Sequence, residues 1–141
     1  MGAKSIKRIS YAMHDPATGA YRHRALTDNG FVVNTFGTAA EVLDSFKANG
    51  PPDLLITHAK MPHSMEFNHI ETHFGLITGV ALYRRARGSY RHLPVIIYTE
   101  KEHAAHVLQD VQDPLLSIFR PGALRNHVDL ANLAASMLEA V

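Results

Sequence analysis

The sequence predicts an α/β domain in which helices cover both faces of a parallel sheet. Short runs rich in β-branched and aromatic residues alternate with longer segments of helical periodicity, an order typical of this class. The run at 53–58 is apolar almost throughout, as expected for a central strand buried on both faces. With 141 residues the chain is long enough for one compact domain, so we expect a single domain over 1–141.

Clear signals bound the first predicted strand and helix. The strand is expected at 8–13. Asp15 then supplies a capping carboxylate and Pro16 suits the first helical position. Gly30 is expected to end this helix.

The second strand and helix are equally well marked. The strand is expected at 31–35. Thr38 and Glu41 match a capping box, which predicts a helix to about residue 48. The Gly-Pro-Pro run at 50–52 stops it.

The rest of the chain continues the alternation, which gives five strands and five helices in total. The expected elements are a strand at 53–58, a helix at 79–87, a strand at 92–98, a helix at 104–112, a strand at 115–119 and a helix at 124–139.

Composition excludes several functional classes. The 14 Lys and Arg residues nearly balance the 13 Asp and Glu residues, so no nucleic-acid partner is indicated for this domain. The chain has no cysteine, which excludes disulfides, thiolate catalysis and Cys-based zinc sites. No apolar stretch is long enough to span a bilayer, and no signal core follows the basic N-terminal residues. We therefore expect a cytoplasmic protein without a membrane partner.

Several landmarks occur in the order of a known family. They are the run 53–58 followed by Met61-Pro62, the run 94–99 and the run 117–121. From about residue 7 to 138 the chain resembles the receiver domain of two-component response regulators. The resemblance implies a flavodoxin-like sheet with strand order 2-1-3-4-5 and a role in phosphorelay signal transduction.

The resemblance also identifies positions where this sequence departs from the family's chemistry. The third strand of a receiver ends in a phosphate-accepting aspartate, and here that position is His58. The family's acidic pair falls on Met13 and His14, and only the following residue, Asp15, is acidic. Magnesium requires hard oxygen ligands, which a thioether and imidazoles do not provide. We therefore expect a degenerate pseudo-receiver with no phosphoacceptor aspartate and no cofactor.

Other pocket positions are kept in part. By resemblance, Thr99 takes the place of the family's Thr or Ser, and Arg120-Pro121 takes the place of Lys-Pro. The planar guanidinium of an arginine suits carboxylates or oxyanions. Ser117 takes the relay position of a bulky aromatic, whose movement a serine cannot reproduce. Thr99 and Arg120 could equally be remnants of the fold without a role.

An insertion at about 63–77 separates Met61-Pro62 from Gly79, which matches the glycine that begins the third helix in the family. Apolar residues at helical spacing would allow part of it to form a lid. The segment also contains weak candidates for ligands of a transition metal, at His63, Glu66, His69 and His73. Solvated histidines on a loop explain this pattern more simply, so we expect no metal site.

The last predicted helix is apolar over about half its circumference, more than one buried stripe requires. We assign Leu130, Leu133, Met137 and Val141 to an interaction face, through which the chain could form a homodimer. The alternative is that the whole apolar surface is buried within one chain.

Three functions follow from these observations. The first is a receiver-like signalling module that is not phosphorylated on aspartate and acts by binding a protein partner. The second is a sensor that binds a metal or a small anion with its histidine-rich rim and Arg120. An enzyme is the third, but no catalytic spacing accompanies His58, His14 and Asp15, so we expect no enzymatic activity.

Overall fold

The computed structural model describes residues 6–13, 16–61, 72, 77–99, 107–120 and 126–140. Five strands form one parallel sheet in the order β2-β1-β3-β4-β5. The strands are β1 (Arg8–Ala12), β2 (Val32–Phe36), β3 (Leu54–His58), β4 (Val95–Tyr98) and β5 (Leu116–Phe119). The predicted α/β class and strand order are confirmed.

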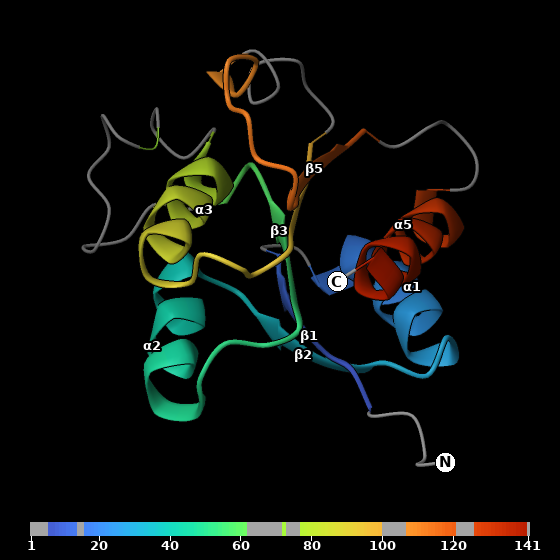
Figure 1. Ribbon diagram of the computed structural model, residues 1–141. Coiled ribbons are helices and arrows are strands. Elements are labelled where there is room, and N and C mark those ends of the chain that lie inside the picture. Colours follow the sequence, from blue (N-terminus) through green and yellow to red (C-terminus); the bar gives the residue numbers. More distant parts are fainter. Residues whose placement is uncertain are drawn as a thin grey trace, which may run out of the picture.

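Helices cover both faces of this sheet, as Figure 1 shows, with α2 and α3 on one face and α1 and α5 on the other. Their bounds are α1 (Pro16–Asp28), α2 (Ala39–Asn49), α3 (Thr78–Ser89) and α5 (Asn126–Ala140). The described residues thus form four helices, where we expected five. The helix expected at 104–112 falls partly on residues outside the described ranges. Its described part is helical at Val107 and then forms a turn, with a 3.0 Å hydrogen bond from the Val111 amide to the Leu108 carbonyl. Among the described helices, none combines the length and apolar character that crossing a bilayer would require.

Strand alternation divides the core into two layers. Successive side chains of a strand point to opposite faces of the sheet. Leu55 of β3 therefore packs in the layer under α2 and α3, whereas Leu54 and Ile56 pack in the layer under α1 and α5. His58 has the same parity as Leu54 and Ile56, which places its side chain on the α1 and α5 side.

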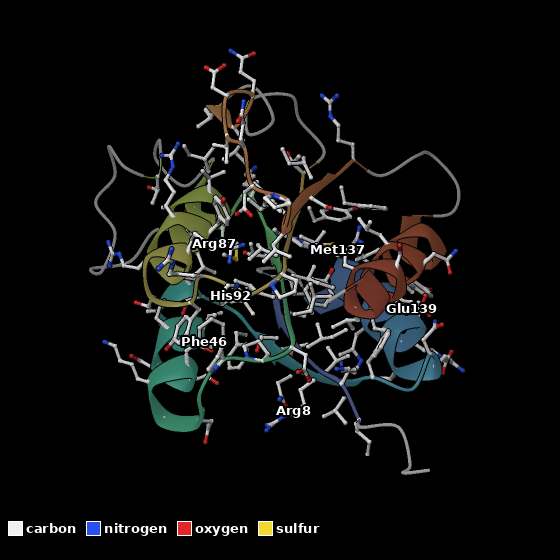
Figure 2. All side chains as sticks on the ribbon, in the orientation of Figure 1. Arg8, Phe46, Arg87, His92, Met137 and Glu139 are labelled. Atoms are coloured by element: carbon white, nitrogen blue, oxygen red, sulfur yellow. The ribbon has the colours of Figure 1, made fainter. Side chains whose placement is uncertain are left out.

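The boundaries of α2 are those that the sequence predicts. The hydroxyl oxygen of Thr38 accepts a 3.2 Å hydrogen bond from the amide of Glu41, as an N-cap residue does. Gly50 ends the helix with a φ of 80° and donates its amide to the carbonyl of Phe46 at 2.8 Å. Phe46 itself lies on the inner side of α2 (Figure 2) and is 2% exposed.

The start of α3 packs directly on the end of β3. The amide of Gly79 donates to the carbonyl of Ala59 at 2.9 Å, and the hydroxyl of Thr78 donates to the carbonyl of Met61 at 2.6 Å. A Cβ on Gly79 would overlap the carbonyl oxygen of His58 and would lie 3.0 Å from the Cα of Ala59. The glycine is therefore required by the close approach of two backbones.

The other end of α3 is held by a carboxylate. Asp113, in the segment before β5, accepts hydrogen bonds from the Tyr83 hydroxyl at 2.6 Å and from Arg87 Nε at 2.9 Å. Its second oxygen accepts from the amide of Leu115 at 2.9 Å. Burial alone would raise the pKa of Asp113, but these hydrogen bonds and the charge of Arg87 outweigh it and lower the pKa from the ordinary value of 3.8.

We expect Gly79→Ala to lower the free energy of unfolding by about 3 kcal/mol, because the added methyl group meets backbone atoms that cannot move aside. Gly88→Ala is the matched control on the same helix, since a Cβ there meets nothing within 4 Å. That change should raise stability by about 0.5–1 kcal/mol. Urea denaturation of both variants measures the difference, and equal effects would contradict the close approach at Gly79.

We expect Asp113→Asn to lower the free energy of unfolding by about 2 kcal/mol near neutral pH, because hydrogen bonds to a charged, mostly buried carboxylate are lost. A depressed pKa in the folded state stabilises the protein above the unfolded pKa, and this contribution is lost as pH falls through the folded value. The difference in free energy of unfolding between wild type and variant should therefore become smaller below about pH 4. Denaturation at a series of pH values tests this, with the exposed Asp110→Asn as the control; a gap that is constant down to pH 2 would contradict it.

Candidate functional site

His58 ends β3 at the carboxyl edge of the sheet, where parallel α/β sheets bind their ligands. Its side chain is half-buried and lies between two tyrosines from the neighbouring strands. The Nε2 atom shares a 2.8 Å hydrogen bond with the hydroxyl of Tyr11 on β1. On the other side, the imidazole stacks on the ring of Tyr98 at the end of β4, with ring centres 4.5 Å apart and planes 20° apart.

Arg22 of α1 extends this arrangement into the interior. Its side chain is only 5% exposed, and its guanidinium carbon lies 4.2 Å from the centre of the Tyr98 ring. Arg22 also donates a hydrogen bond to the hydroxyl of Tyr98. Phe119 at the end of β5 stacks on Tyr98, with ring centres 5.7 Å apart. We call these five residues, Tyr11, Arg22, His58, Tyr98 and Phe119, the His58 cluster.

The phenol of Tyr11 remains protonated in this environment. Burial raises its pKa strongly, and the nearby charge of Arg22 and its hydrogen bond offset this only in part. A neutral hydroxyl can either donate to or accept from an imidazole nitrogen. The His58 cluster therefore holds the imidazole by a hydrogen bond on one side and by ring stacking on the other.

Met13 occupies the position at which the family resemblance places one of the acidic residues. Its amide extends the ladder by donating to the carbonyl of Phe36 at 2.9 Å, and its side chain is only 7% exposed. The thioether lies against α1 at Gly19, where a Cβ would overlap its sulfur atom. Met13 therefore behaves as a packed core residue at this edge.

The other predicted pocket residues lie on β4 and β5. Thr99 is buried and donates its amide to the carbonyl of Phe119 at 3.0 Å, whereas Arg120 is exposed. Ser117 pairs with Ile96, so its side chain is on the face of the sheet that carries Tyr98 and Phe119. Tyr98, at the end of β4, stacks on His58, and no motif in the sequence marks it as a residue of this site.

Several predicted residues lie outside the described ranges, and the structure makes no statement about them. They are His14, Asp15 and Pro121 of the pocket, the candidate metal ligands His63, Glu66, His69 and His73, and Val141 of the last helix. Within the ranges that are described, no three His, Asp or Glu side chains are grouped as a metal site requires.

The proposed interaction face on the last helix requires a correction at Leu130. Leu130 is fully buried against the sheet, at 0% exposure, so it cannot belong to an exposed face. Leu133 and Met137 are partly buried and pack against the same layer, and Met137 lies between α5 and the sheet in Figure 2. The error arose because a helical projection shows the width of an apolar surface but not which part meets the sheet.

Comparisons with known proteins support the fold. No family model matches the sequence, and no curated protein does. Among solved structures, a CheY-like response regulator receiver domain from Methanospirillum hungatei has a TM-score of 0.73 at 20% identity, covering 96% of each chain. A receiver protein from Sinorhizobium medicae has a TM-score of 0.74 at 18% identity, also over 96% of each chain.

A third similar structure contains a bound ligand. The response regulator TrrA from Thermotoga maritima, in complex with Mg²⁺ and BeF, has a TM-score of 0.70 at 19% identity, covering 94% of this chain and 99% of that one. The chain thus has the fold of receiver domains.

We expect Tyr11→Phe to lower the free energy of unfolding by about 1 kcal/mol, because the hydrogen bond to His58 is lost inside the protein. Tyr21→Phe is the control, since Tyr21 is 72% exposed. Urea denaturation measures stability, and ¹⁵N NMR of the imidazole nitrogens reports on the bond directly. A His58 imidazole spectrum that is the same in wild type and Tyr11→Phe would contradict it.

Proposed function

We propose that this chain is a receiver-like signalling module that is not phosphorylated on aspartate and that acts by binding a protein partner. The observation that carries the proposal is the residue at the end of β3, where an imidazole held by Tyr11 and Tyr98 stands in place of a carboxylate. The receiver fold supports a role in signal transduction. The side chains at the carboxyl edge of the sheet argue against phosphorylation of an aspartate as the signal that the chain receives.

The requirements of phosphoryl transfer are the reason why these side chains argue against phosphorylation of an aspartate. Formation of an aspartyl phosphate requires a carboxylate nucleophile and a divalent cation that neutralises the charge of the transferred group. His58 supplies no carboxylate. Met13 presents a thioether packed on α1, which is a poor ligand for Mg²⁺.

A protein partner is the form of output that best suits this arrangement. Ring stacking and hydrogen bonds within the His58 cluster connect β1, β3, β4, β5 and α1. The carboxyl edge of the sheet is therefore a packed surface. We infer that the chain is not an enzyme and that its state is set by which partner occupies it.

The first test is a titration with magnesium and beryllofluoride, followed by amide NMR. We expect the resonances of residues 58, 99 and 120 to stay in place, because no carboxylate is present at position 58 to bind the analogue. TrrA from Thermotoga maritima, which was crystallised with Mg²⁺ and BeF, serves as the positive control. Shifts at these residues comparable to those of the control would overturn the proposal.

A substitution separates the loss of the nucleophile from the loss of the metal ligands. In His58→Asp a carboxylate returns at position 58, but the thioether of Met13 remains. We expect this variant also to give no response to beryllofluoride, and thermal denaturation confirms that it is folded. If His58→Asp responds to magnesium and beryllofluoride, a magnesium site exists, and residue 58 alone prevents the wild-type chain from binding the analogue.

A further inference from the structure

The β2 strand lies at one end of the sheet, and within the described part of the chain its outer side pairs with no other strand. It contacts β1 along one side and α1 and α2 on its two faces, and it is the terminal strand of the described sheet. Three of its five residues, Val32, Asn34 and Thr35, are exposed. At the other end of the sheet, β5 has no exposed residue. Among the described residues the two edge strands therefore differ, and β2 is the more exposed of them.

The sequence of β2 lacks the features that keep an exposed edge from pairing. Natural edge strands carry lysine, proline, inward charges or bulges, which prevent association with another strand. Residues 31–36, Phe-Val-Val-Asn-Thr-Phe, contain no charge and no proline. The register of β2 with β1 is continuous over all five residues, without a bulge. This edge is therefore suited to accept another strand.

The backbone of β2 determines which strand fits. Val32 donates its amide to Lys7 at 3.0 Å and Phe36 accepts from the amide of Met13 at 2.9 Å, so these two residues direct their polar groups toward β1. Adjacent residues of a strand direct their backbone groups to opposite sides. Val33 and Thr35 consequently present theirs at the open edge, one on each side of Asn34.

We propose that β2 pairs antiparallel with β2 of a second copy of this chain, with Asn34 on the two-fold axis. In this register Val33 lies opposite Thr35 of the other copy, and each such pair exchanges both of its backbone hydrogen bonds, as antiparallel pairing requires. Val32, which is 44% exposed in the single chain, comes opposite Phe36 and gains an apolar neighbour.

This arrangement joins the two sheets into one continuous sheet. The contact is the same surface on both copies, so it closes as a dimer and does not propagate into a fibre. Pairing of two short strands buries less surface than a standard interface of about 1,600 Å², so the dimer should dissociate on dilution. The contact involves neither the His58 cluster nor α5, so it is independent of the function proposed above.

Sedimentation velocity of the whole chain over a concentration series tests the dimer. Asn34→Lys places two ammonium groups face to face across the axis, where paired Cα atoms are about 4.5 Å apart. Thr35→Pro removes an amide from the open edge. Each variant should weaken association by about tenfold or more. Ser136→Lys, at an exposed position on α5, is the matched control and should leave association unchanged.

Amide hydrogen exchange provides a second measurement that does not depend on the variants. The amides of Val33 and Thr35 should become protected as the protein concentration rises, while those of Val32 and Asn34, directed to β1, are protected throughout. The proposal is overturned if the chain is monomeric at all concentrations, if Asn34→Lys associates as wild type does, if Ser136→Lys abolishes association, or if the amides of Val33 and Thr35 exchange equally fast at low and high concentration.

Discussion

The ring of Tyr98 is the contact on which the carboxyl edge of the sheet depends. One aromatic side chain meets the imidazole of His58, the guanidinium of Arg22 and the ring of Phe119, and so links two strands of the sheet and a helix to the end of β3. A cation over an aromatic face and stacked rings are each worth only about 1 kcal/mol. Their combination at a single ring nonetheless holds His58, Arg22 and Phe119 against one another.

This arrangement explains why the fold could be predicted more completely than the site. Strand runs, the N-cap at Thr38 and the stop at Gly50 are local signals, and each is confirmed. The His58 cluster depends on the register between strands, in which His58 pairs with Tyr98 and Tyr11 pairs with Ile56. Register follows from the packing of the whole sheet, which a single sequence does not state.

Long-range polar contacts were beyond prediction for the same reason. Arg22 reaches Tyr98 across 76 positions of sequence, and Arg87 reaches Asp113 across 26. An arginine on an amphipathic helix is ordinarily read as a solvated side chain. Its partners become visible only when the layers of the fold are assembled.

The contact between Gly79 and the end of β3 has a consequence for how this scaffold can change over evolutionary time. At Gly79 the close approach is to the main-chain carbonyl of residue 58, while the side chain at that position has the parity of Leu54 and Ile56, on the face opposite α3. This contact at the end of β3 therefore does not depend on the identity of the amino acid at position 58. The side chain at position 58 can therefore change during evolution without disturbing the backbone contact that places α3 against β3.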